Sequence, residues 1–169
     1  MSRVRRCDDR DFASIHSIIN AAAQAYRGVI PADRWHEPYM SDIDLRREIS
    51  AGVEFWGHEI DDQLVGVMGT QRVRDVELIR HAYVLPAYQR HGVGRVLIQH
   101  IVSRRDRRML VGTWADATWA IAFYQRHGFE LVSSSEQRRA LLQTYWTIPD
   151  RQIETSAVLE LRTSSAWGT

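Results

Sequence analysis

The feature that most constrains the fold is a change of apolar period near Val53. Before that point, apolar residues recur at helical spacing along 8–26, which predicts a helix on one face of a core. After it, the runs 53–60, 64–73 and 76–84 have strand character and are separated only by short turns. Three successive strands with such short connections predict an antiparallel meander.

The remaining segments alternate between strands and helices. We expect strands at 4–7, 109–114, 129–134 and 152–161, and helices at 42–49, 92–105, 115–128 and 135–146. This order predicts an α/β (α+β) fold with a mixed sheet and helices on both faces. We expect a single domain over 1–162 and a frayed C-terminal tail over 163–169.

The composition is that of an ordinary globular protein. Of 169 residues, 44% are hydrophobic and 25% charged, and no apolar run approaches the roughly 18 residues that span a bilayer. No apolar stretch typical of a signal peptide follows the basic start, and the single Cys7 has no partner for an internal disulfide, so we expect a cytoplasmic protein. The net charge of +1 gives no reason to expect a membrane or nucleic acid as an obligatory partner.

The basic residues are all arginine. The 22 positive side chains include no lysine, which excludes a P-loop lysine, a Schiff-base lysine and a lysine general base. One cysteine and no H-E-x-x-H pattern also give no reason to expect a metal site.

The segment QRHGVG, 89–94, lies where a predicted strand gives way to a predicted helix. The first turn of a helix has unpaired N–H groups at the positive end of its dipole, and glycines there let an anion reach the backbone. The same glycines could serve a tight turn alone. A Rossmann fingerprint would need a third glycine at Leu97, and a Walker A motif would need a lysine.

The wider context resembles a known family. YVLPAYQRHGVGRVLIQH (83–100) is similar to the acetyl-CoA signature of the GCN5-related N-acetyltransferases (GNAT), and FYQRHGF (123–129) is similar to their second signature. The two are about thirty residues apart and the order of elements matches over 1–162. The resemblance implies a GNAT-like fold, whose mostly antiparallel sheet is splayed between its fourth and fifth strands.

The resemblance implies acetyl-CoA (coenzyme A) as the co-substrate. The amides of 89–94 would hold the pyrophosphate, with Arg90 and Arg95 as counter-charges, and the main chain of Tyr83 and Val84 would pair with pantetheine like an added strand. Ala117 stands where the family often has an Asn. We therefore expect Trp114 or Trp119 to shape the wall of the pantetheine site instead. The implied cofactor-binding residues are Tyr83, Val84, Gln89, Arg90, His91, Gly92, Val93, Gly94, Arg95, Trp119 and Phe123.

The resemblance also implies direct attack of an amine on the thioester. Tyr124 occupies the position of the general acid, with a core tyrosine as the alternative reading, and a main-chain N–H near Ala82 would stabilise the oxyanion. For the general base the sequence leaves three options open: Glu77, His81, or water alone. The absence of G-x-S-x-G agrees with a mechanism without an acyl-enzyme.

The expected reaction is acetylation of a primary amine on a small molecule or peptide. The acceptor should lie against the loop 27–40; the candidate residues for acceptor binding are Arg27, Trp35, His36, Glu37, Tyr39 and Trp114. Two alternatives stay open: a non-catalytic acyl-CoA-binding regulatory domain, and an RNA-associated acetyltransferase recruited through the arginines of 103–108. A homodimer is also left open.

Overall fold

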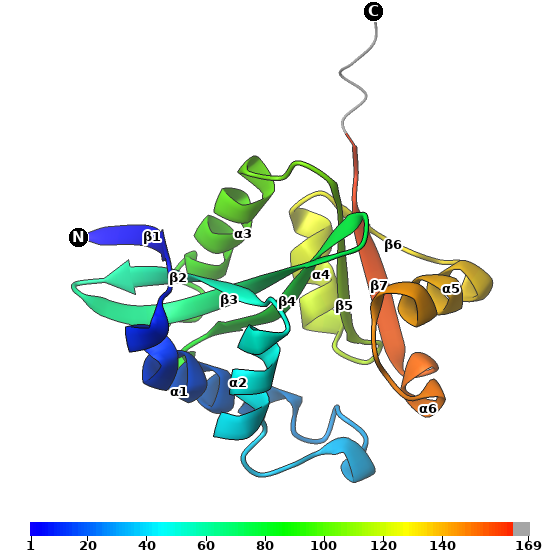
Figure 1. Cartoon of the computed structure of the whole chain (residues 1–169), viewed down its shortest axis with the longest axis horizontal. Coiled ribbons are helices and arrows are strands. Elements are labelled where there is room, and N and C mark those ends of the chain that lie inside the picture. Colours follow the sequence, from blue (N-terminus) through cyan, green and yellow to red (C-terminus); the bar gives the residue numbers. More distant parts are fainter. Residues whose placement is uncertain (164–169) are drawn as a thin grey trace, which may run out of the picture.

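One seven-stranded sheet forms the centre of the molecule (Figure 1). The computed structural model describes residues 1–163, so the expected frayed tail lies outside the described residues except for Thr163. The strands are β1 (Ser2–Arg6), β2 (Glu54–Ile60), β3 (Gln63–Val73), β4 (Val76–Val84), β5 (Arg108–Trp114), β6 (Phe129–Leu131) and β7 (Ser156–Leu161). Their spatial order is β1-β2-β3-β4-β5-β7-β6, and β4 with β5 is the one parallel pair among them.

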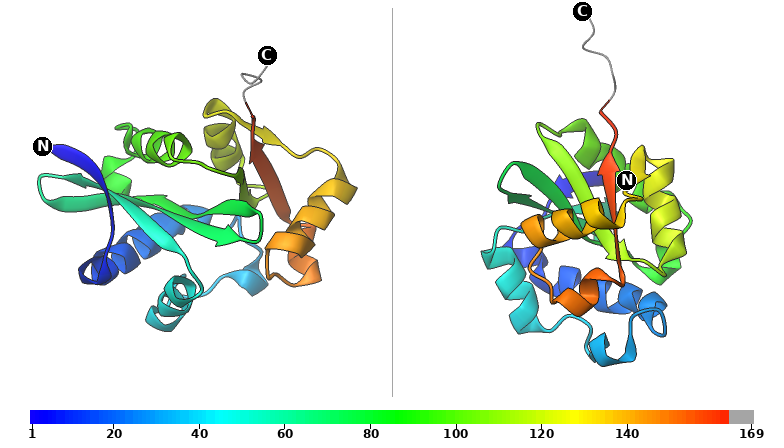
Figure 2. Two further views of the ribbon diagram at one scale, coloured as in Figure 1. Left: turned by 45° about the horizontal axis from the view of Figure 1, so that its top comes forward. Right: turned by 90° about the vertical axis from the view of Figure 1, so that its right-hand side faces the viewer.

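Helices cover both faces of this sheet, as predicted (Figures 1 and 2). They are α1 (Phe12–Ala23), α2 (Asp42–Ser50), α3 (Val93–Ser103), α4 (Thr118–Arg126), α5 (Ser135–Tyr145) and α6 (Asp150–Ile153). On one face, α1 and α2 bury Ile15 and Leu45 against Phe55. On the other, α3 buries Leu97 and Ile98 in a cluster with residues of α4. Within residues 1–163, no helix is long and apolar enough to cross a bilayer.

The predicted meander of three antiparallel strands is confirmed, whereas the predicted ends of two later strands are wrong. The strand expected at 129–134 stops at Leu131, because the Ser134 side chain accepts a hydrogen bond from the Gln137 N–H and so starts α5. The strand expected at 152–161 begins only at Ser156, since Pro149 leads into the short helix α6.

The sheet is splayed between β4 and β5, as the family resemblance implied. The two strands pair in parallel only from Val76–Ile79 against Arg108–Val111. Within β4, a register shift places two residues, His81 and Ala82, opposite the single residue Met68 of β3. This β-bulge holds His81 at a positive φ of 55°, which costs a non-glycine residue about 1 kcal/mol. Such strain is often found at functional sites.

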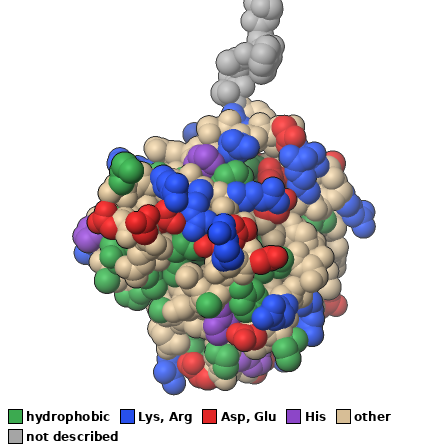
Figure 3. Space-filling model, turned by 60° about the vertical axis from the view of Figure 1, so that its left-hand side comes forward, with side chains coloured by type: hydrophobic (Ala, Val, Ile, Leu, Met, Phe, Trp, Pro, Cys, Tyr) green, Lys and Arg blue, Asp and Glu red, His purple; other side chains and the backbone are tan. Residues whose placement is uncertain are grey.

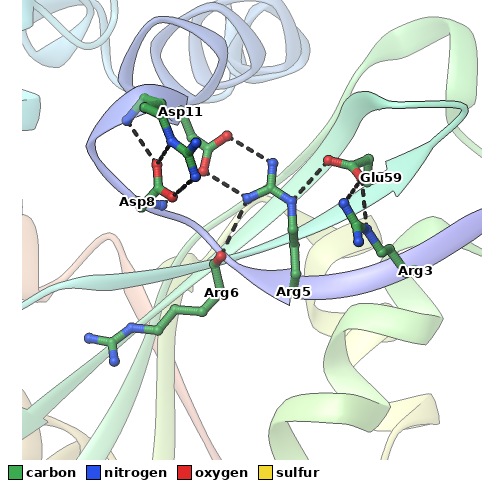
Figure 4. A network of polar contacts seen from close by, with 7 residues as sticks. Arg3, Arg5, Arg6, Asp8, Asp11 and Glu59 are labelled. Carbon is green, nitrogen blue, oxygen red and sulfur yellow. Dashed lines mark hydrogen bonds and ion pairs between the residues drawn. The ribbon is translucent and has the colours of Figure 1, made fainter.

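A network of ion pairs fastens the start of α1 to the sheet edge (Figure 4). The Arg5 guanidinium donates to Asp11 at 2.8 and 2.9 Å and to Glu59 of β2 at 2.9 Å. Asp11 also accepts from the backbone N–H of Asp8 at 2.8 Å, which closes a capping box. These contacts lower the pKa of Asp11, chiefly through Arg5, and that of Glu59 through Arg5 and Arg3.

Positive and negative charges are mixed on the side of the molecule where the N-terminal strands lie. Figure 3 shows acidic and basic side chains interspersed on that side. Two of the four arginines at 104–108, which follow α3, are neutralised in the same way. Arg107 pairs with Asp106 at 3.2 Å and Arg108 with Glu160, while Arg104 lies over the Trp56 ring. Paired arginines present a weaker field to nucleic acid than their number suggests.

We expect Asp11→Asn to lower the free energy of unfolding by about 1–2 kcal/mol at pH 7, because it removes the anionic partner of Arg5. The pKa of Asp11 is lowered in the folded state, so its contribution is present above its ordinary value of 3.8 and is lost as the pH falls below it. The difference between wild type and variant should therefore shrink between about pH 4 and 2. Thermal unfolding across pH measures this; Asp9→Asn, which removes an exposed carboxylate outside the network, is the control. Equal losses in both variants would contradict the assignment.

Candidate active site

A groove of about 850 Å³ runs along the splay, between the start of α3 and α4. Its walls include the end of β4, the 89–95 segment, and Trp119 and Phe123 of α4. Every residue that the resemblance implied for cofactor binding lines this one groove. These are Tyr83, Val84, Gln89, Arg90, His91, Gly92, Val93, Gly94, Arg95, Trp119 and Phe123.

The backbone of the loop before α3 is shaped to present N–H groups. Arg90 and Gly92 have positive φ values of 66° and 78°, and such alternation directs successive N–H groups into a concavity. Gly92 is the N-cap of α3 and no side chain caps the helix, so its first-turn N–H groups are left for a ligand. A Cβ at Gly94 would lie 3.3 Å from the Phe123 ring, which would force that ring to move. The start of α3 is therefore built as an anion cradle.

Positive side chains without ion-pair partners surround this cradle. Arg90, Arg95 and Arg126 line the groove, and none of them makes a salt bridge or hydrogen bond through its side chain within residues 1–163. Burial, together with Arg126 and Arg95, lowers the pKa of His127, which lies beside them. Arg126 and His127 were missed in the sequence, although they follow Phe123 by three and four residues and so share its helix face.

A second, smaller cavity of about 190 Å³ lies on the other side of the splay. It is enclosed by β4, β5 and the segment after α5, where the Trp146 indole lies against Gly112 of β5. The groove and this inner cavity share four lining residues: Tyr26, Ala82, Tyr83 and Tyr124. Molecules bound in the two spaces would therefore meet beside these residues. Tyr26 was not predicted; it lies at the far end of the segment expected to be the first helix.

Tyr124 is buried and lines both spaces. Its residue is 6% exposed, and its ring packs edge-on against Phe123 and Phe129 at centroid distances of 5.2 and 5.6 Å. Burial raises its pKa further above neutrality, so the phenol is protonated at neutral pH and has a proton to donate. The interpretation of Tyr124 as a core packing residue and its interpretation as the general acid are therefore compatible.

The bulge in β4 turns His81 toward α2. Its Nε2 lies 3.0 Å from Glu48 Oε2, and Arg80 lies 3.4 Å from the same oxygen. The hydrogen bond from His81 lowers the pKa of Glu48, against its burial, and the charge of Arg80 adds to that effect. His81 lines the inner cavity. Glu48 was missed because nothing in the sequence indicates that a helix residue 33 positions earlier reaches the bulge.

Glu77, the other candidate base, lies away from this meeting point. It sits in the part of β4 that is still paired with β5, opposite Met109. Burial raises the pKa of Glu77, but the residue lines neither the groove nor the inner cavity. The neighbouring residue, Leu78, is fully buried.

An outer cavity of about 280 Å³ adjoins the inner one. The two share Tyr39, Trp114 and Gln152, and the outer one also reaches His36 and Glu48. Three of the six predicted acceptor residues, His36, Tyr39 and Trp114, therefore line these cavities.

The other three predicted acceptor residues support the loop instead. The Trp35 indole N–H donates to Glu37 at 3.0 Å, and Arg27 lies 3.9 Å from the same carboxylate. The Trp35 ring stacks on Tyr39 at 5.7 Å, which holds Tyr39 at the mouth of the inner cavity. Arg27, Trp35 and Glu37 line neither cavity.

Cys7 does not belong to this site. It lines a separate cavity of about 940 Å³ between α1, α2 and β2, where burial raises the pKa of its thiol to about 12. A protonated thiol at that position is a poor nucleophile. Within residues 1–163, no group of three or more His, Cys, Asp and Glu side chains is arranged to hold a metal ion.

Comparison with known proteins agrees with this geometry. The Acetyltransferase (GNAT) domain family matches residues 19–145. The [ribosomal protein bS18]-alanine N-acetyltransferase of Salmonella typhimurium is 34% identical over 73 residues, which is 41% of this chain and 49% of the relative. The chain thus matches about half the length of that relative. Peptidyl-lysine N-acetyltransferase YiaC of Escherichia coli is 29% identical over 118 residues, covering 69% of this chain and 75% of YiaC.

Solved structures share the fold. The PaiA N-acetyltransferase of Thermoplasma acidophilum, solved in complex with coenzyme A, superposes with a TM-score of 0.69 at 15% identity, covering 96% of this chain and 99% of that one. The ribosomal-protein-S18-alanine N-acetyltransferase of Escherichia coli superposes with a TM-score of 0.66 at 18% identity over the whole of both chains. The family match, which spans most of the chain, and the splayed sheet with its cradle lead to one conclusion: the chain belongs to the GNAT acetyltransferase family.

Proposed function

We propose that the protein transfers an acetyl group from acetyl-CoA to a primary amine by direct attack within a ternary complex. The observation that carries this proposal is the meeting of two spaces at Tyr26, Ala82, Tyr83 and Tyr124. One space ends in an anion cradle with unpaired arginines, which suits a pyrophosphate. The other is a small cavity walled by aromatic side chains, which suits an amine-bearing group.

Acetyl-CoA would supply the activated acyl thioester, and the residues of the groove would hold it. The amides at the start of α3 and the guanidinium groups of Arg90, Arg95 and Arg126 would bind phosphate oxygens. Beyond Ile79, the edge of β4 that faces β5 has no strand partner among residues 1–163. The main-chain groups of Tyr83 and Val84 are therefore placed to pair with an extended chain in that gap.

Three groups of the chain are placed to assist proton and charge movement. His81, oriented by Glu48, would take the proton from the attacking amine. The main-chain N–H of Ala82, at the bulge, would stabilise the negative charge that develops on the acyl oxygen. Tyr124 would donate its proton to the departing sulfur. Among the options left open by the sequence, we favour His81 as the base because it lines the inner cavity and Glu77 does not.

The acceptor is proposed to be a primary amine on a small molecule or peptide. The two relatives are named for an alanine of a ribosomal protein and for peptidyl-lysine, both of which offer an amine on a polypeptide. Release of free thiol from acetyl-CoA, measured across amino acids, polyamines, aminoglycosides and peptides, tests the proposal. Coenzyme A binding without turnover of any amine would favour the regulatory alternative.

We expect Gly92→Asp to abolish the rise in Tm that acetyl-CoA gives the wild type, because a carboxylate would occupy the cradle and repel phosphate. The space around a Cβ there is open apart from Arg95 at 3.8 Å, so the apo protein should stay folded. Gly52→Asp is the matched control: this glycine also has positive φ, 101°, and lies in the turn before β2, away from the groove. Undiminished stabilisation of Gly92→Asp by acetyl-CoA would remove the cradle assignment.

Tyr124→Phe should reduce kcat by about 10²-fold while acetyl-CoA affinity stays within about threefold, since only the hydroxyl is lost. Because burial raises the pKa of Tyr124, the loss should be constant from about pH 6 to 9. Tyr145→Phe removes a hydroxyl that bonds Asp75 outside the site and should leave kcat unchanged. Wild-type turnover by Tyr124→Phe would make Tyr124 a packing residue.

His81→Gln should lower kcat/KM by about 10²-fold and Glu48→Gln by about tenfold. If Glu48 acts through His81, the double variant should lose no more than His81→Gln alone. Glu54→Gln, which breaks an exposed pair with Arg6, is the control. An unchanged rate in His81→Gln would leave water as the base.

A further inference from the structure

The arginines of this chain differ in whether they have a partner. Fourteen of the 22 make a salt bridge to a carboxylate, as the ion pairs of residues 1–163 show. Arg46 and Arg104 lie over aromatic rings, Arg105 donates to a backbone carbonyl, and Arg74 lies exposed in a turn. The four that remain all line cavities of the site: Arg90, Arg95 and Arg126 line the groove, and Arg34 lines the outer cavity.

Of these four arginines, Arg34 is the one that lies outside the groove proposed to bind the cofactor, so cofactor binding does not account for its lack of a partner. It lies in the loop between α1 and α2, at the end of a short turn of 3-10 helix. Its Nη2 is buried and has no hydrogen-bond partner within the described residues. The nearest carboxylate in sequence, Asp33, is already paired with Arg151 at 2.8 Å. A buried guanidinium N–H without an acceptor is costly, and a rotation of the Arg34 side chain toward an anion bound in the outer cavity would remove that cost.

The other ionised side chains of the outer cavity are satisfied within the protein. Asp44 accepts from the Ser41 hydroxyl at 2.7 Å and from Arg47 at 3.3 Å. Glu48 is held by His81 and Arg80. Of the arginine, aspartate and glutamate side chains on this cavity, Arg34 is thus the one whose charge is unmatched among residues 1–163.

The position of Arg34 indicates which end of a bound acceptor would lie in the outer cavity. The inner cavity ends at Tyr124 and Ala82, where the reacting nitrogen must lie, and the outer cavity continues from it past Tyr39 and Trp114. A ligand that fills both would have its amine inside and its other end beside Arg34. A planar guanidinium binds a carboxylate through two parallel hydrogen bonds.

We propose that the acceptor amine carries a carboxylate at a distance from the reacting nitrogen, and that Arg34 binds that carboxylate. The proposal rests on the proposed acetyltransferase function and names the class of acceptor for it: an ω-amino acid or a short peptide with an acidic side chain beyond its free N-terminus. Arg34 is then a specificity-determining residue for the acceptor, with no part in binding acetyl-CoA.

Matched probe pairs test this. They are 4-aminobutyrate with 4-aminobutyramide, and Ala-Glu amide with Ala-Gln amide, each assayed by thiol release from acetyl-CoA. The wild type should prefer the acidic member of at least one pair by about tenfold or more in kcat/KM. Arg34→Gln should abolish the preference, whereas Arg34→Lys should keep part of it because a point charge remains without the fork.

Arg47→Gln is the matched control, since Arg47 lines the same cavity but is 74% exposed and already paired with Asp44. It should retain the preference for the acidic probe. Calorimetric binding of both members of each pair to the protein saturated with coenzyme A gives a second readout that needs no turnover. Binding that prefers the acidic member and depends on Arg34, without any acetylation, would overturn the proposed function but not the anion site. No preference in the wild type, or one that Arg34→Gln leaves unchanged, would overturn this inference.

Discussion

The parallel pairing of β4 with β5, and its end at Ile79 and Val111, is the constraint on which the rest of the site depends. Parallel neighbours require a crossover connection, and here that connection is α3. The helix must begin where β4 ends, so its unpaired N–H groups lie at the same edge at which the strands separate. The gap and the anion cradle are therefore two consequences of one piece of topology.

The second structural constraint on the site is the bulge in β4. Side chains alternate between the two faces of a strand, and the extra residue changes which face each one takes. Tyr83 packs with the α1 and α2 cluster, while Ala82 packs with the α3 and α4 cluster. His81, at positive φ, can then reach Glu48 of α2. One irregular residue thus places a histidine–carboxylate pair beside the inner cavity and leaves Ala82, a small residue, facing the groove.

The parts of this architecture that the sequence predicts are those with a local signal. Glycines at 92 and 94, between a strand and an apolar helix, identify the cradle, and the strand pattern of 53–84 identifies the meander. Glu48 and Arg34 have no such signal, because their roles depend on where α2 and the 27–40 loop pack on the splayed sheet. The strand ends at Leu131 and Ser156 were missed for a related reason. A cap at Ser134 and a helix after Pro149 override a continuous apolar run.

The two halves of the site are built from different parts of the chain, one mainly from main-chain groups and the other mainly from side chains. This difference determines how closely each half specifies its ligand. The half proposed to hold the cofactor relies on main-chain groups of β4 and α3, which any sequence with this fold must provide, and adds unpaired arginines around them. The half proposed to hold the acceptor relies on side chains from α2, the 27–40 loop and the segment after α5. Loops accept substitution more readily than strands and helices do. Under the proposed function, the fold constrains the donor closely, whereas a few side chains set the identity of the amine. In a chain whose only permanent cations are arginines, one guanidinium without a carboxylate partner among residues 1–163 would then select that amine.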